Sequence, residues 1–273
     1  MTLCYIDYLE HRFAEHPPSR KGLRTRALLR IAAAKVLREK GYHGLRITDV
    51  TRAAETAEGS FYLYFKDKTD ITLGVLTGML DDFFAMHMAN TGAPTPAEAV
   101  RNANRQWIGL CRQNAGLMRC VFQLADEEPR FAHLLHHSNR QWYGRIAQSF
   151  ARQHEEGVGG GTALFAAYLL GSMMDEIVRK LIAYPDPEFL AVLADIKADD
   201  LAVADGASLM WLKILYEVPP RLDDLPPAAA DLASWMNHKG SGKTAKPGQA
   251  EPEPVRRMRS AGPRAGVRRG RPA

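Results

Sequence analysis

Apolar residues recur every three or four positions along most of the chain, which is the spacing of one face of an α-helix. Residues 24–40 show this pattern first, and Gly41 follows where a C-terminal helix cap belongs. The residues on the common face are Leu29, Ala33, Val36 and Leu37. No run of useful length alternates apolar and polar residues, so no strand is predicted. The pattern predicts an all-α protein.

Glycine and proline residues divide the rest of the chain into further predicted helices. Two short helices, at 47–54 and 57–63, are joined by a turn of a few residues. A long helix begins near Lys68, with Asp67 as its N-cap and Asp70 three residues later in a box-like start. The remaining predicted helices cover residues 96–113, 115–125, 128–154, 162–184, 187–197, 200–217 and 228–236.

The stretch 157–174 carries no charge over 18 residues, which is long enough to suggest a membrane span. Its several glycines and the Asp175-Glu176 pair that follows argue against insertion into lipid. A helix buried on most of its circumference, in a core or at a subunit interface, explains the stretch better. We therefore predict no membrane partner.

The composition is that of a folded globular protein, with 46% hydrophobic and 25% charged residues. It excludes a fully disordered chain and a polytopic membrane protein. Cys4, Cys111 and Cys120 are too few and too scattered for a disulfide framework, which fits a reducing cytoplasm. The first twenty residues contain no apolar segment of the kind found in signal peptides. We expect a cytoplasmic protein.

Charge is unevenly distributed along the chain. Residues 20–80 hold twelve Lys/Arg against six Asp/Glu, and residues 238–273 hold ten against two. Residues 81–237 are acidic, with thirteen against twenty. Two basic segments flanking an acidic centre indicate a polyanionic partner at the ends and a different role in the middle. Because residues 238–273 have almost no large apolar side chain, we expect a disordered basic tail.

The two short helices at 47–63 have the spacing of a helix-turn-helix motif. Ile47, Val50 and Ala54 can face the core from the first helix, and Phe61 and Phe65 from the second. The polar residues between them, and two tyrosines beside lysines, then face solvent. Phenolic hydroxyls and ammonium groups bind phosphates, so this surface is suited to duplex DNA.

The same residues resemble a known family. The runs Gly41-Tyr42, 47–50, Ala53-Ala54 and 59–68 (GSFYLYFKDK) look like the DNA-binding domain of TetR-type (TetR/AcrR) transcriptional regulators. The resemblance covers residues 24–75. It implies an N-terminal helix-turn-helix three-helix domain followed by a C-terminal helical domain for ligand binding and dimerisation.

The resemblance implies a role for each matching position. Glu58, Gly59 and Ser60 would lie on the recognition helix in the major groove, and Thr48 would approach a phosphate or a base edge. Tyr62 and Tyr64 would touch backbone and sugar, and Lys68 would bind a phosphate at a helix N-terminus. Arg24 and Arg26 lie where such proteins often have a short basic arm.

Several residues depart from the family pattern. Glu55 replaces the usual turn glycine at a position expected to need a positive φ, at a cost of about 1 kcal/mol. Ala57 replaces the usual serine cap, and Arg46 and Thr51 replace threonine and alanine. Glu58 places an acid against the duplex, where it accepts from a cytosine amino group or points away. We therefore expect an unusual operator sequence.

No arrangement of residues predicts catalysis, a cofactor or a metal. His133, His136 and His137 lie close together but have neither an HExxH context nor an accompanying cysteine, so we interpret them as a solvated or pocket-lining helix face. No phosphate-binding loop or nucleophile–base arrangement can be assembled. We expect a protein that is not an enzyme.

These observations predict four segments: an N-terminal extension (1–22), a helix-turn-helix domain (23–70), a helical effector-binding and dimerisation domain (71–237) and the basic tail (238–273). The favoured function is a ligand-responsive repressor that binds a palindromic operator as a homodimer, through helices 162–184 and 200–217. The tryptophans and methionines of the middle domain suit a small apolar or aromatic effector. The alternative is a helical structural DNA-binding protein without an inducer.

The tail allows a prediction from charge alone. Arginines spaced by Gly, Pro and Ala can neutralise phosphates but hold no fixed geometry for reading bases. Truncation after Asn237 should lower the salt dependence of DNA binding by about 3–5 units in the log–log slope per protomer, equally on operator and random duplex. An unchanged slope in a salt titration would show that the tail does not contact DNA.

Overall fold

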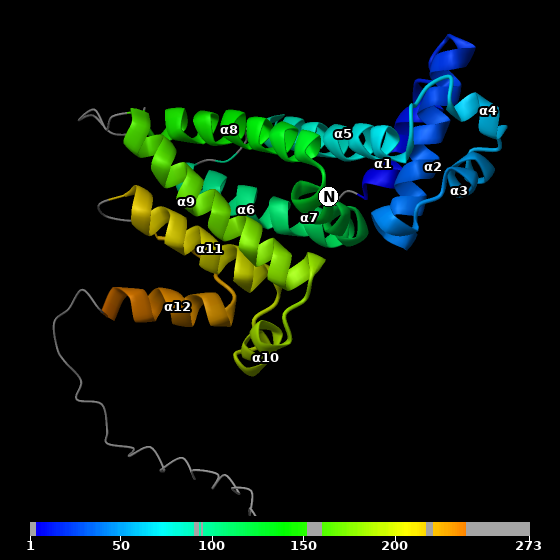
Figure 1. The fold of residues 1–273 in the computed structure, drawn as a ribbon. Coiled ribbons are helices and arrows are strands. Elements are labelled where there is room, and N and C mark those ends of the chain that lie inside the picture. Colours follow the sequence, from blue (N-terminus) through cyan, green and yellow to red (C-terminus); the bar gives the residue numbers. More distant parts are fainter. Residues whose placement is uncertain (1–3, 90–92, 94, 152–159, 217–220, 239–273) are drawn as a thin grey trace, which may run out of the picture.

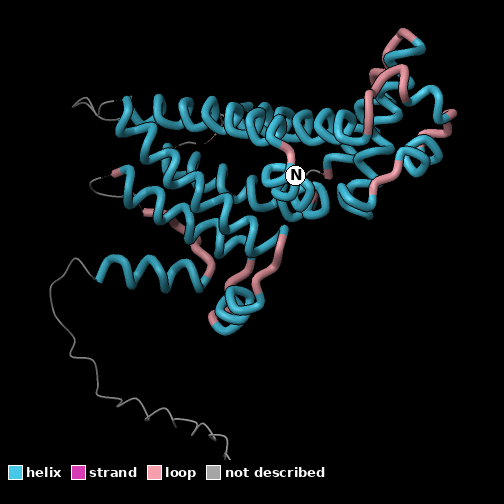
Figure 2. The backbone as a smooth tube through the Cα atoms, viewed as in Figure 1, coloured by secondary structure: helices cyan, strands magenta, loops and turns pink. Residues whose placement is uncertain are grey.

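The computed structural model describes residues 4–89, 93, 95–151, 160–216 and 221–238, and every regular element within these ranges is a helix (Figures 1 and 2). The all-α prediction is confirmed. The helices are α1 (Tyr5–Glu15), α2 (Lys21–Gly44), α3 (Ile47–Ala53), α4 (Glu58–Phe61), α5 (Lys68–Ala89), α6 (Pro96–Gln113), α7 (Ala115–Glu127), α8 (Pro129–Ala151), α9 (Gly160–Val178), the π-helical turn η1 (Arg179–Ala183), α10 (Pro187–Asp195), α11 (Asp200–Leu215) and α12 (Pro227–His238). The predicted tail lies outside the described residues.

The helix boundaries follow the local signals in the sequence. Gly41 has a φ of 68°, so the regular part of α2 ends at the predicted cap and a short turn continues to Gly44. At the start of α5 the amide of Asp70 donates to Asp67 Oδ1 (2.8 Å), and the carboxylate of Asp70 accepts from the amide of Lys66 (2.9 Å). The predicted capping pair therefore forms, although the second bond reaches Lys66 rather than Asp67.

The N-terminal extension contains a helix that the sequence analysis did not predict. Helix α1 buries Tyr5, Ile6 and Leu9. The backbone amide of Tyr5 donates to Asn114 Oδ1 (2.8 Å), and its hydroxyl donates to Asp82 (3.3 Å). Tyr8 and Phe13 also pack against the core, so the apolar residues of α1 do recur at helical spacing, a signal that the sequence analysis did not use. The two hydrogen-bonding partners of Tyr5 are distant in sequence and could not be predicted from it.

The helices form two parts joined by α5 (Figure 1). Helices α1 to α4 lie together at one end. Helix α5 leaves this end and runs alongside α8, while α9 packs on α8 and α11 packs on α6. Helix α2 also packs on α7, so the N-terminal part rests directly on the larger helical part. Helix α12 covers α11 from outside.

The uncharged stretch folds into α9, which is buried on one side only. Ala167, Leu170 and Met174 are buried, whereas Phe165 and Leu169 are 65% and 56% exposed. The expectation of burial around most of this helix is therefore wrong for a single protomer. Within the described residues, no helix has the length and apolar character needed to cross a membrane.

A buried ion cluster fixes α6 against α11. Asp205 is fully buried and accepts from Arg105 (2.6 Å) and Arg101 (2.9 Å). Arg101 also donates to the carbonyls of Asp223 and Asp224, which precede α12. Burial opposes ionisation of Asp205, but the hydrogen bonds from both arginines hold its pKa below the ordinary value. The carboxylate therefore joins three segments.

We expect Asp205→Asn to lower the free energy of unfolding by about 3–5 kcal/mol, because it leaves two partly buried guanidinium groups without their counter-charge. Asp200→Asn is the matched control on the same helix: Asp200 pairs with Arg112 at the surface, and its loss should cost about 1 kcal/mol or less. Urea denaturation of the two variants measures both values. Equal losses would contradict the assigned role of the buried cluster.

Candidate nucleic-acid interface and central cavity

Helices α3 and α4 form the predicted helix-turn-helix against α2. Val50, Phe61 and Phe65 are buried, as the sequence pattern predicted. Asp49 is held by Lys40 of α2 (2.8 Å), and this hydrogen bond holds the pKa of its carboxyl below the ordinary value. The first helix of the motif is thus oriented by apolar packing on one side and by an ion pair on the other.

The turn between α3 and α4 has the backbone geometry expected for it. Glu55 has a φ of 51°, so the position does need the left-handed conformation that glycine adopts most easily. The amide of Thr56 donates to the carbonyl of Thr51 (3.0 Å) and closes the turn. Ala57 caps α4 without a side-chain hydrogen bond, as its residue type predicted. The motif tolerates these departures because Phe61 and Phe65 anchor the segment that follows.

Most of the predicted DNA-binding residues on α3, on α4 and just after α4 are exposed. Thr48, Glu58 and Gly59 are exposed, and Ser60 is half-buried. Tyr62 packs edge-on against Phe61 (ring centroids 5.4 Å apart) and is nevertheless 56% exposed. That these residues contact DNA stays a prediction.

Tyr64 and Lys68 are less free than Tyr62. The hydroxyl of Tyr64 packs close to Gly22 near the start of α2. A Cβ added to this glycine would lie 3.3 Å from the hydroxyl oxygen. The ammonium group of Lys68 lies 4.6 Å from the ring centroid of Tyr42, whose hydroxyl shares a hydrogen bond with Thr69 (2.9 Å). This contact holds the ammonium group of Lys68 at the N-terminus of α5. The N-terminus of a helix attracts anions, as the ammonium group does.

Arg24 and Arg26 do not form an arm. Both lie inside α2, which begins at Lys21, and both are exposed. The guanidinium of Arg26 stacks over the ring of Phe65, 5.6 Å from its centroid. The interpretation of these residues as a short basic arm is therefore wrong, because both lie within the helix predicted over residues 24–40, which in the structure begins at Lys21. That they bind DNA stays a prediction.

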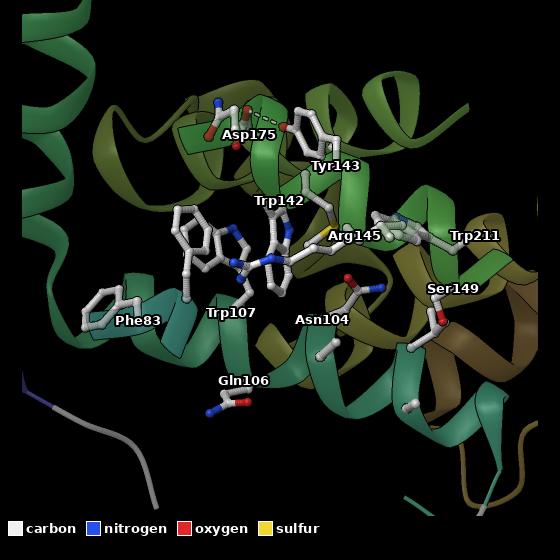
Figure 3. Close-up of a pocket in the computed structure, with 18 of the residues that line it drawn as sticks. Phe83, Asn104, Gln106, Trp107, Trp142, Tyr143, Arg145, Ser149, Asp175 and Trp211 are labelled. Carbon is white, nitrogen blue, oxygen red and sulfur yellow. Dashed lines mark hydrogen bonds between the residues drawn. The ribbon is translucent and has the colours of Figure 1, made fainter. Parts of the chain in front are cut away.

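The larger helical part encloses a cavity of about 680 Å³ between α5, α6, α7, α8, α9 and α11 (Figure 3). Its wall is mainly aromatic and aliphatic. Phe84 of α5 stacks on Trp107 of α6 (ring centroids 6.2 Å apart) and on Trp142 of α8 (5.2 Å). Trp211, Met118 and Met174, which the sequence analysis grouped with these tryptophans, also line the cavity. Its size and lining suit a small organic molecule.

One acidic side chain lies in this wall. Asp175 of α9 accepts a hydrogen bond from the hydroxyl of Tyr143 of α8 (3.4 Å), drawn as a dashed line in Figure 3. Burial raises the pKa of Asp175 to about 6, and the hydrogen bond from Tyr143 opposes part of this rise. Burial and the nearby charge of Asp175 raise the pKa of Tyr143 as well. The ring of Tyr143 lies directly against Gly171, where no Cβ fits.

Comparison with known proteins agrees with this geometry. Residues 30–75 match the family described as bacterial regulatory proteins, tetR family. These residues form a TetR-family DNA-binding domain. A segment of 52 residues is also 36% identical to the fatty acid metabolism regulator protein of Bacillus subtilis (strain 168), covering 19% of this chain and 27% of that protein.

The fold beyond the TetR-family domain also has solved counterparts. The transcriptional regulator FadR from Bacillus subtilis, solved in complex with stearoyl-CoA, aligns with a TM-score of 0.55 and 18% identity over 69% of this chain and 98% of that chain. A transcriptional regulator from Saccharomonospora viridis, solved in complex with choline, aligns with a TM-score of 0.54 and 18% identity over 72% of this chain and 98% of that chain. At this level of identity the likeness establishes the fold alone.

The sequence analysis located the surface of the TetR-family domain but not the polar residues of the cavity. Asp175 entered it only as the charge that ends an apolar stretch, and Tyr143 was not singled out. His133, His136 and His137 are exposed and do not line the cavity. Among the described residues, no group of three or more His, Cys, Asp or Glu side chains is placed to hold a metal ion.

The raised pKa of Asp175 predicts a pH-dependent loss of stability. In the unfolded chain this carboxyl titrates near 3.8, whereas in the folded protein it titrates near 6. The folded state therefore binds more protons between these values, and the free energy of unfolding falls as pH rises from about 4 to 6. We expect Asp175→Asn to remove this fall and to raise stability at pH 7 by about 1–3 kcal/mol.

The matched control is Glu176→Gln. Glu176 is the next residue on α9, and its hydrogen bond with surface Arg179 lowers its pKa, so its substitution should not stabilise the protein at pH 7. Urea denaturation at pH 4.5 and pH 7 distinguishes the two variants. An Asp175→Asn variant that is less stable than the parent at pH 7 would contradict the assignment.

Proposed function

We propose that this protein is a ligand-responsive transcriptional repressor that binds a palindromic operator as a homodimer. The observation that carries the proposal is the course of α5. This helix begins at the DNA-facing surface with Lys68 and reaches the cavity with Leu80, Phe83 and Phe84. A molecule entering the cavity therefore contacts the same helix that positions a phosphate-binding residue.

Helix α5 is also fastened to the DNA-binding domain along its length. Arg30 of α2 donates to the carbonyl of Gly74 in α5 (2.8 Å), and Ile71, Val75 and Leu76 are fully buried. Displacement of the Phe83–Phe84 end by a ligand would be transmitted to α2 as a rotation of the whole domain. In a dimer this changes the separation of the two recognition helices, so that they no longer fit successive major grooves.

The exposed apolar face of α9 supports dimerisation. Phe165 and Leu169 lie one turn apart on this face, and Ile214 of neighbouring α11 is 59% exposed. Pairing α9 and α11 with the same helices of a second protomer would form a four-helix bundle and cover these side chains. Met174 and Leu212 of the same two helices are buried within the protomer and are not available to this interface.

The cavity favours a small apolar or aromatic effector. The two ligands named for the solved structures, stearoyl-CoA and choline, differ in charge and size. The curated relative regulates fatty acid metabolism, and an acyl chain would fit among the aromatic side chains. The structural DNA-binding alternative gives no reason for a cavity of this size.

The deciding experiment is a nuclease footprint with the full chain on the DNA upstream of its own gene. A single protected palindrome, released by a cavity ligand, supports the repressor. Uniform coverage without release would support the structural alternative and overturn the proposal. Mass measurement at micromolar concentration tests the dimer separately, and a monomer would contradict it.

We expect Lys68→Gln to weaken binding to operator DNA and to random duplex DNA by a similar factor, because the side chain is proposed to bind a phosphate. The slope of log affinity against log salt should fall by about 0.9 per protomer. Tyr64→Phe should likewise weaken binding to both kinds of duplex by a similar factor. Lys35→Gln is the control, since Lys35 pairs with Glu10 of α1 away from α4. A changed sequence preference in the Lys68 variant would contradict the assigned role.

A further inference from the structure

One half-buried acid, Asp175, lines the cavity and has no cationic partner among the described residues. Within the part of the chain that the structure describes, Tyr143 is the one side chain that donates to Asp175, through a long hydrogen bond of 3.4 Å. The contrast with Asp205 is direct, because that buried carboxylate is held by two arginines. A buried carboxylate costs free energy when it is left without a counter-charge. Asp175 therefore has unused capacity for a cation or a strong hydrogen-bond donor.

The position of Asp175 makes this capacity available to a ligand. The residue is in the wall of the cavity rather than in a closed core. Figure 3 shows Asp175 and Tyr143 facing each other, with Trp142 and Trp107 on the cavity side of this pair. Tyr168 packs edge-on against Tyr143 (ring centroids 4.8 Å apart). Aromatic faces attract cations, so the surroundings of the acid favour the same ligand charge as the acid itself.

The basic residue of the lining does not satisfy Asp175. Arg145 follows Tyr143 by two positions on α8, which places the two side chains on different sides of the helix. Arg145 is exposed, and no ion pair links it to Asp175. The cavity thus has an acidic, aromatic wall at Asp175 and a basic group near solvent.

We propose that the effector is an apolar molecule carrying one cationic group, a protonated amine or a quaternary ammonium, and that this group binds at Asp175 among the aromatic side chains. The inference rests on the proposed function only in treating the cavity as the effector site. The apolar body of the ligand contacts the Phe84–Trp107–Trp142 stack. A carboxylate or phosphate at the same place would be repelled by Asp175.

Three probes of equal chain length test the charge preference: decyltrimethylammonium, decanol and decanoate, each below its aggregation concentration. Binding to the full chain is measured by calorimetry and by tryptophan fluorescence, since Trp107 and Trp142 line the cavity. We expect the cation to bind about tenfold or more tighter than decanol, and decanoate to bind more weakly than decanol. Equal binding of cation and alcohol, or a preference for decanoate, would overturn the proposal.

Variants assign the preference to Asp175. Asp175→Asn should abolish the advantage of the cation while leaving decanol binding unchanged, and Asp175→Glu should restore part of it. Glu176→Gln, one residue further on α9, should behave as the parent. Retained decanol binding shows that the Asp175→Asn variant keeps its cavity. A cation preference that survives this substitution would overturn the proposal.

The operator assay separates this proposal from the proposed function. If the cation binds through Asp175 but does not release operator DNA, the cation site stands and the repressor mechanism fails. If decanol or decanoate releases operator DNA while the cation binds no better than decanol, the repressor stands and the cation site fails.

Discussion

The rest of the structure depends on α5, which is buried by packing against both parts of the protein. Ile71, Val75, Leu76 and Met79 are fully buried on successive turns, and Phe83 continues this row to the cavity. One helix must therefore pack against α2 in the DNA-binding domain and against α6, α7 and α8 in the larger domain. Since a close-packed core resists small displacements, the two domains cannot shift independently of α5.

Helix α1 strengthens the same junction. Tyr5 contacts α5 through Asp82, the start of α7 through Asn114, and the ring of Phe83 edge-on at 5.9 Å. Phe83 also lines the cavity. A helix that precedes the TetR-family domain in sequence is thus wedged between that domain and the cavity wall. Its position makes the N-terminal extension a structural part of both domains.

The buried Asp205 and the half-buried Asp175 show how stability and function are divided. Asp205 is neutralised by Arg101 and Arg105 and holds α6, α11 and the segment before α12 together. Asp175 has only a tyrosine hydroxyl and is held at a raised pKa by burial. The first arrangement stabilises the fold. The second costs stability in the empty protein and is suited to a ligand that supplies the missing charge.

The sequence by itself determined most of the helices and the place of the helix-turn-helix. The spacing of Leu29 to Leu37 and the cap at Asp67 depend on neighbours within a few positions, whereas the positive φ at residue 55 was expected from the resemblance to TetR-type regulators. Such signals are visible in a single chain because helix periodicity and capping are local. For the same reason the helix-turn-helix could be placed to within a few residues, with its exposed tyrosine at position 62.

Only the tertiary structure decided how α1 packs on α5 and α7, and where the cavity and its acid lie. Tyr5 is held by residues more than seventy positions away, and Asp175 meets Tyr143 across 32 positions and a helix–helix contact. A sequence pattern records which face of a helix is apolar but not which helix covers it. Whether a carboxylate lies in solvent or in a cavity wall depends on that packing, so its charge and its ligand follow from the fold alone.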